Sequence, residues 1–117
     1  MIEYDPAAER AALDWLALTD AGDADGSWAA AASLFRHTVP AAQWAQSLRA
    51  ARTPLGALVS RQMESARLAT ELPGAPDGQY VVFQFQSVFE HKRAATETVT
   101  PMRDVDGHWR VSGYFIR

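Results

Sequence analysis

The chain has 117 residues, of which 48% are hydrophobic and 21% charged, and its formal net charge is -3. These values are typical of one globular domain over residues 1–117 and exclude a wholly disordered chain, a fibrous rod and a transmembrane span. The absence of cysteine excludes disulfides and thiolate chemistry, and the mild acidity argues against nucleic-acid binding. The start has no export-signal pattern, so the protein is cytoplasmic, or periplasmic or secreted if a signal has been removed.

The first half of the chain, where most of the alanines lie, predicts helices. Asp5 and Pro6 are suited to the cap and first turn of one helix, and Asp25 or Ser27 can cap a second. Apolar residues then recur at helical spacing. Three amphipathic helices are expected, over residues 5–19, 28–35 and 41–53.

The second half, which holds most of the valines and phenylalanines, predicts strands. Val81, Phe83, Phe85 and Phe89 alternate with Val82, Gln84, Gln86 and Val88, so the first and more apolar side of the second strand should face a core. Asp106 and Gly107 predict a two-residue hairpin, and Pro101 requires an edge or a bulge. The expected strands cover residues 58–72, 81–89, 94–105 and 108–116, with a helix over 59–70 as an alternative to the first.

These elements predict an α+β fold, in which a helical part (5–53) packs on a sheet part (57–117). The sheet is expected to be a curved four-stranded antiparallel meander. In its last strand, alternation places Trp109, Val111 and Phe115 on one side and Tyr114 and Ile116 on the other.

Particular strings of residues resemble a small bacterial family. They include Ser27-Trp28-Ala-Ala-Ala, Arg52-Thr-Pro-Leu-Gly56, Leu72-Pro-Gly-Ala-Pro-Asp-Gly78 and Asp106-Gly-His-Trp-Arg-Val-Ser-Gly-Tyr114. Across nearly the whole chain, the sequence is similar to the family catalogued as domain of unknown function 4019. This resemblance implies no activity and no functional residues. The order of elements also resembles cystatin-like and nuclear-transport-factor-2-like cone folds, and such a likeness concerns fold alone.

Known catalytic and metal-binding motifs are not found. The Asp-rich segment 20–26 lacks the ligand spacing of a calcium loop, and the three histidines have no paired spacing for zinc. Nucleophile-elbow, dinucleotide and phosphate-loop motifs are missing too. No cofactor and no metal site are therefore predicted.

Polar and aromatic side chains of the sheet are the candidate binding residues for a ligand or partner. Arg61 can meet Glu97 or Gln84 across the strands, and Glu97, if enclosed by aromatic rings, could act as an acid or base. Arg49 and Arg52 on the third helix, with Arg61 and Arg67, could attract an anion, but a solvated surface is the favoured interpretation. The candidates are Arg61, Tyr80, Gln84, Gln86, Glu97, Arg110 and Tyr114.

An apolar second face of the sheet predicts a homodimer, because such a patch is seldom left bare. It would consist of Tyr80, Val82, Val88, Tyr114 and Ile116. The favoured function is non-catalytic binding of a partner or of a small apolar or anionic ligand, at the helix-sheet cleft or the sheet face. The alternatives are a cofactor-independent isomerase or dehydratase that uses Glu97, and the sensor module of a transcription regulator.

Overall fold

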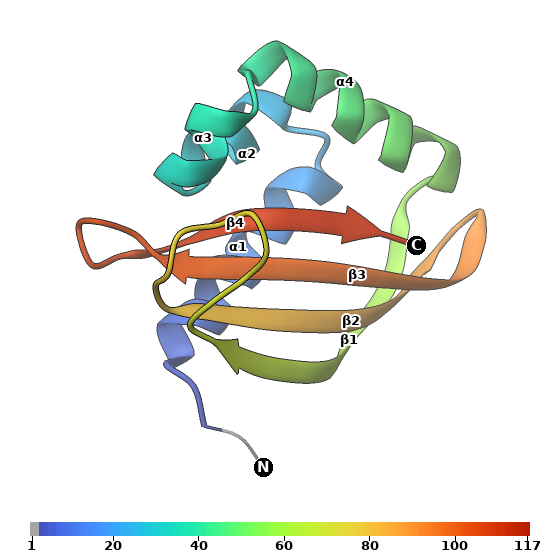
Figure 1. Ribbon diagram of the computed structural model, residues 1–117. Helices are drawn as coiled ribbons and strands as arrows, with labels where there is room; N and C mark the ends of the chain where they lie inside the picture. The colour runs from blue at the N-terminus through green and yellow to red at the C-terminus, as the bar shows by residue number, and fades with distance from the viewer. Residues whose placement is uncertain (1–2) are drawn as a thin grey trace.

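The computed structural model describes residues 3–117 and has helices first and strands second (Figure 1). The helical elements are α1 (Pro6–Asp20), α2 (Ala24–Ala30), α3 (Ser33–Thr38), α4 (Ala41–Arg52) and the 3-10 turn η1 (Thr53–Leu55). The strands are β1 (Leu58–Ala69), β2 (Tyr80–Phe89), β3 (Lys92–Arg103) and β4 (Trp109–Ile116).

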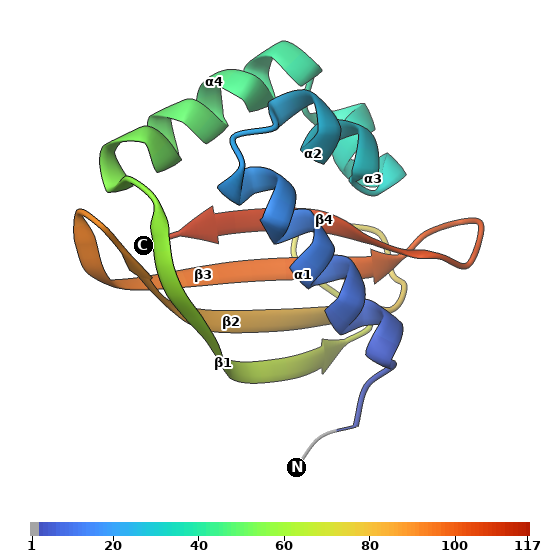
Figure 2. The same cartoon turned by 180° about the vertical axis from the view of Figure 1, so that it is seen from behind.

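The four strands form one antiparallel sheet in the order β1-β2-β3-β4, so the predicted α+β class and meander are confirmed. Helix α1 crosses one face of this sheet, called here the inner face, whereas α2, α3 and α4 gather beside β4 (Figure 2). On the opposite, outer face the connection between β1 and β2 loops across β3 and β4 (Figure 1).

The predicted second helix is wrong, because the chain forms two short helices there. Ala31 and Ala32 between them are extended and have no exposed surface. The N–H of Ala32 donates to the carbonyl oxygen of Val111 over 2.8 Å. A backbone contact with the edge of β4 therefore replaces a helical hydrogen bond, and three predicted helices become four in the described chain.

The turns also differ from prediction in their geometry. The connection between β3 and β4 spans residues 104–108, and the Gly107 N–H donates to the Asp104 carbonyl over 2.9 Å. Gly107 has a φ of 86° but Asp106 is not left-handed, so the predicted two-residue hairpin does not form, because its type I′ and II′ turns both need a left-handed first residue. The helix alternative for 59–70 is wrong as well, since this segment is strand β1.

A bulge in β4 reverses the predicted facing of its second half. Pro101 pairs with Val111 and Thr100 pairs with Gly113, which leaves Ser112 as the extra residue. Val111 lies on the inner face, and strict alternation would place Tyr114, three residues later, on the outer face. The extra residue shifts the alternation by one, so Tyr114 also turns to the inner face. Ile116, which pairs with the buried Glu97, follows Tyr114 inward.

The core lies between α1 and the inner face of the sheet. Phe83, Phe85 and Val99 are buried there against Trp15 and Leu16. The tryptophan indoles also donate to fixed partners, since Trp15 Nε1 bonds the Ser27 carbonyl (2.8 Å) and Trp44 Nε1 bonds the Ser27 hydroxyl (2.9 Å). These two bonds therefore connect α1 and α4 to α2.

Candidate functional site

Glu97 lies in the middle of β3 and has no exposed surface. Its Oε1 accepts hydrogen bonds from Arg61 Nε (2.8 Å) and the Ser87 hydroxyl (2.6 Å), and its Oε2 accepts one from the Tyr114 hydroxyl (2.5 Å). Strand register explains the convergence. Glu97 pairs with Phe85, and Ser87 pairs with Arg61, so these side chains all point to the inner face.

Asp20, at the end of α1, joins the same cluster. Arg61 binds it with both terminal nitrogens, Nη1 to Oδ2 (2.9 Å) and Nη2 to Oδ1 (2.8 Å). Arg52 of α4 adds a bond from Nη2 to Oδ1 (2.9 Å), and its guanidinium lies 4.6 Å from the ring centre of Phe89. The buried charge cluster, defined here as Asp20, Arg52, Arg61 and Glu97, thus connects two helices to the sheet.

Two acids and two bases make the buried charge cluster neutral. Burial by itself raises the pKa of the Asp20 carboxyl, but the bonds from Arg61 and Arg52 outweigh burial and hold that pKa below 3.8. Burial, followed by the negative charge of Glu97, raises the pKa of the Tyr114 hydroxyl above 10.0. At neutral pH Tyr114 is therefore a neutral donor and Asp20 an ionised acceptor.

The cluster is closed in this structure. Because Glu97 has no exposed surface, no solute can reach its carboxylate unless the side chains around it move. An acid or base must contact the group whose proton it transfers, within about 3.2 Å or through one water. The arrangement as it stands stabilises the contact between helices and sheet.

The remaining predicted candidates lie apart from the cluster. Gln84 and Gln86 lie on the outer face, where Gln86 Nε2 donates to Glu64 Oε2 over 2.7 Å. Arg110 pairs with Asp104 and Asp106 at the turn between β3 and β4. The predicted site residues therefore do not form one site.

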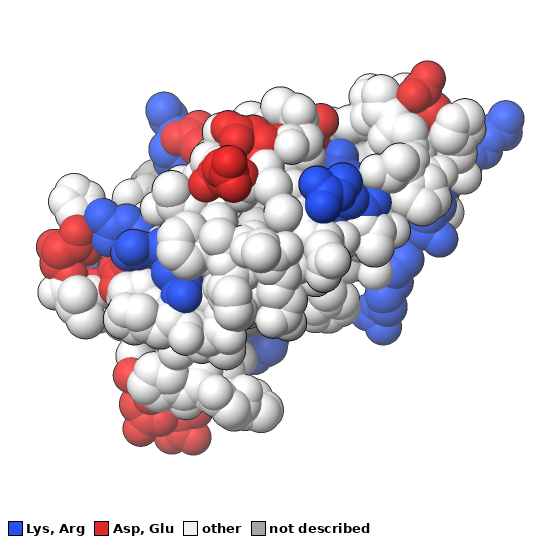
Figure 3. All heavy atoms as spheres, turned by 90° about the horizontal axis from the view of Figure 1, so that it is seen from above, with Lys and Arg blue, Asp and Glu red and all other residues white. Residues whose placement is uncertain are grey.

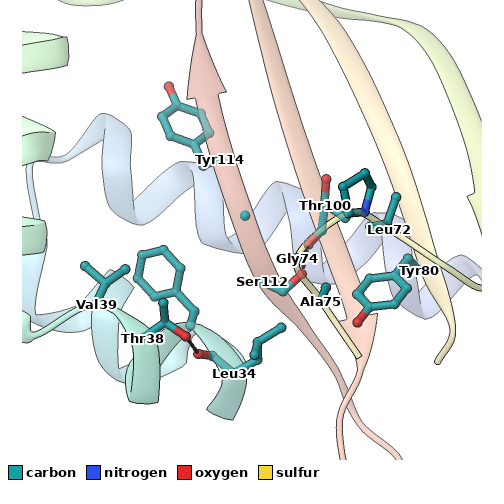
Figure 4. A pocket seen from close by; sticks show the side chains of 13 residues that line it. Leu34, Thr38, Val39, Leu72, Gly74, Ala75, Tyr80, Thr100, Ser112 and Tyr114 are labelled. Atoms are coloured by element: carbon teal, nitrogen blue, oxygen red, sulfur yellow. Dashed lines mark hydrogen bonds between the residues drawn. The ribbon is translucent and has the colours of Figure 1, made fainter. Parts of the chain in front are cut away.

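Tyr80 belongs to a separate pocket of about 360 Å³ between α3, the loop after β1 and the β3–β4 part of the sheet (Figure 4). We call it the α3 pocket. Its walls include Leu34 and Thr38 from α3, Leu72 and Ala75 from the loop, and Tyr80, Ser112 and Tyr114 from the sheet. The loop is held in place by the Tyr80 hydroxyl, which donates to the Pro76 carbonyl over 2.6 Å.

The α3 pocket is uncharged. None of the residues that line it is acidic or basic, and seen from above a patch without charged side chains lies over α3 and the start of α4 (Figure 3). Concave apolar walls with a few polar groups are the usual form of small-molecule sites, which begin at about 300 Å³.

The chain matches the model of the family described as protein of unknown function (DUF4019) over residues 11–114. It belongs to this family. No curated protein and no solved structure shows significant similarity to the chain. The resemblance expected from the sequence is therefore confirmed for the family.

Sequence reasoning missed three members of the site of this DUF4019 domain. Asp20 was expected in a loop, Arg52 on a solvated or anion-attracting surface, and Ser87 was not singled out. Helical phase could have indicated Arg52, because Trp44, Leu48 and Arg52 are spaced by four residues and all are buried. Nothing local marks Asp20, whose partners are 32 and 41 residues away.

Among the described residues, 3–117, no group of three or more His, Cys, Asp or Glu side chains is arranged to hold a metal ion. Within the same residues, every helix is too short or too polar to cross a membrane.

Proposed function

We propose that this DUF4019 domain is a non-catalytic binding module that holds a small, largely apolar molecule in the α3 pocket. The observation that carries the proposal is a concave wall, assembled from three separate parts of the chain, that is apolar and yet presents hydroxyl groups. An apolar ligand gains about 25 cal/mol for each Å² removed from water, and the hydroxyls can fix its orientation.

The buried charge cluster supports the choice of binding over catalysis. The enzyme alternative needs an accessible Glu97, whereas that carboxylate accepts from Arg61, Ser87 and Tyr114 and has no exposed surface. The closed cluster instead gives the pocket a rigid support. A sensor module of a regulator remains compatible with this proposal, because a sensor must bind a ligand. The likeness to cystatin-like or nuclear-transport-factor-2-like proteins rests on the order of elements alone.

Indole, a neutral bicyclic probe, tests the proposal by backbone amide chemical-shift mapping. Shifts should concentrate in α3, in residues 72–75 and around residues 112–114. The variant Ala75→Trp, which fills the pocket from the exposed loop, should abolish them. The matched control Phe115→Ser removes an apolar side chain, 53% exposed, from a position that does not line the pocket, and should retain them. The proposal would be overturned if the shifts persisted in Ala75→Trp, or if they were lost in Phe115→Ser.

Pairing of two copies through the outer face stays a prediction, but the residues that support it differ from those expected from the sequence. Tyr114 and Ile116 point inward and Tyr80 is covered by the loop, so the predicted patch is wrong for these three residues. Val82 and Val88, both half-buried, and the exposed Phe115 remain there. Sedimentation velocity at micromolar concentration tests it, and a monomer would contradict it.

A further inference from the structure

The hydroxyl groups of the α3 pocket are oriented by bonds within the protein. Thr38 Oγ1 donates to the Leu34 carbonyl over 2.7 Å, and Ser112 Oγ donates to the Thr100 carbonyl over 2.8 Å. A carbonyl oxygen can only accept, so each of these hydroxyls has already committed its single hydrogen. What each oxygen still offers is a lone pair.

The hydroxyl hydrogens of the two tyrosines that line the pocket are also donated within the protein. The Tyr80 hydroxyl donates to the Pro76 carbonyl, and the Tyr114 hydroxyl donates to the Glu97 carboxylate. Figure 4 shows the Tyr114 hydroxyl pointing away from the other residues that line the pocket. Four of the five side-chain hydroxyls that line the pocket are therefore spent as donors, and Thr100 is the exception.

The absence of charged side chains also favours a neutral ligand. No lysine, arginine or histidine lines the pocket, so an anionic ligand would leave water without a compensating cation. A ligand that donates a hydrogen bond would find acceptor lone pairs on opposite walls, on α3 and on β4.

We infer that the α3 pocket selects neutral apolar molecules that carry a hydrogen-bond donor, such as an N–H or O–H group on an aromatic ring, and that it rejects anions. This inference rests on the proposed function and specifies its ligand class. It also narrows the sequence-based expectation of an apolar or anionic ligand to the first of the two.

The test compares four probes of nearly equal shape by chemical-shift titration of the intact chain. Indole carries an N–H donor, benzofuran and 1-methylindole do not, and indole-2-carboxylate adds a negative charge. Because one neutral hydrogen bond changes affinity by about three- to ten-fold, indole should bind about five-fold more tightly than benzofuran and 1-methylindole. Indole-2-carboxylate should bind more weakly than any neutral probe.

The variants Thr38→Val and Ser112→Ala remove the two acceptors and keep the walls apolar. Combined, they should reduce the preference for indole over benzofuran to about one. Phe115→Ser serves as the matched control and should keep the preference. Thermal unfolding of each variant shows whether it is folded, and Thr38→Val alone supports the test if Ser112→Ala disturbs the bulge.

The outcomes separate the two proposals. Equal binding of indole and benzofuran, or binding of indole-2-carboxylate as tight as that of indole, would overturn the ligand class and leave the binding function standing. Absence of binding by all four probes would overturn the binding function itself. Shifts confined to the outer face would do the same, since the probes would then occupy another surface.

Discussion

Tyr114 and Glu97 connect the α3 pocket to the buried charge cluster. The ring of Tyr114 lines the pocket, and its hydroxyl donates to Glu97 Oε2 over 2.5 Å on the inner face of the sheet. The wall of the proposed binding site is therefore held by a carboxylate that is itself fixed by Arg61 and Ser87. Changes in the cluster should affect first the stability of the domain and then the pocket.

The variant Glu97→Gln should lower the free energy of unfolding by about 3–5 kcal/mol, because removing one partner of a buried ion pair leaves the other charge uncompensated. Urea unfolding followed by tryptophan fluorescence measures this. Glu64→Gln, an exposed carboxyl on β1, is the matched control and should cost less than about 1 kcal/mol. Equal costs for the two variants would show that the cluster carries no stability.

The tyrosine hydroxyls should resist ionisation at alkaline pH. Tyr4, Tyr80 and Tyr114 all have a pKa raised above 10.0, Tyr114 through burial and the charge of Glu97. An acid whose folded pKa is raised adds stability below its unfolded pKa, and that stability is lost as the pH rises through the folded value. Tyrosinate absorbance should therefore appear near pH 10 in denaturant and only at higher pH in the native protein. Coincident titrations would contradict this.

Asp104 should stabilise α3 from outside the helix. Its carboxylate accepts from the Ser33 N–H (3.0 Å) and the Ser33 hydroxyl (2.6 Å), while the N-cap residue Ala32 makes no side-chain cap bond. Loss of a cap typically costs about 0.5–2 kcal/mol, so Asp104→Ala should cost at least that amount. Asp106→Ala, two residues on and exposed, is the control for the loss of the Arg110 pair. Hydrogen exchange of α3 amides should accelerate in Asp104→Ala alone.

Stability should fall in acid through Asp20 and Asp104. The pKa of Asp104 is low because burial, which raises it, is outweighed by the bonds from Ser33, Val105 and Arg110, and that of Asp20 lies below 3.8 for the analogous reason. A carboxyl with a lowered folded pKa adds stability above its unfolded pKa, which is lost as pH falls through the folded value. Unfolding free energies measured from pH 7 downward should therefore be steady above about pH 5 and decline below about pH 4. A flat profile to pH 2 would contradict this.

Deletion of Ser112 should prevent the native packing of β4. Without the extra residue, strict alternation would carry Tyr114 to the outer face and withdraw its hydroxyl from Glu97. We expect loss of the cooperative thermal transition, or a transition lowered by more than 10 °C, on the order of 2 kcal/mol for a domain of this size. The substitution Ser112→Ala keeps the residue count and should fold. A deletion variant that unfolds at the same temperature as the native protein would show that the bulge does not determine which face Tyr114 occupies.

The sequence by itself determined the class of fold, its order of helices and strands, and the core side of β2. Those features depend on local periodicity, as with Val81, Phe83 and Phe85, whose spacing of two is the same in any context. It also indicated Glu97 or Gln84 as the partner of Arg61, and the folded chain selects Glu97, which Arg61 reaches across the intervening strand β2.

Only the tertiary structure decided what surrounds Arg61 and Glu97. Asp20 and Arg52 approach Arg61 because α1 and α4 end at the same place above the sheet, and sequence spacing does not encode that meeting. The facing of Tyr114 depends on one extra residue, Ser112, and a bulge follows from the pairing of two strands rather than from either strand alone. The pocket requires α3, a loop and β4 to meet, so its ligand chemistry is a property of the folded chain.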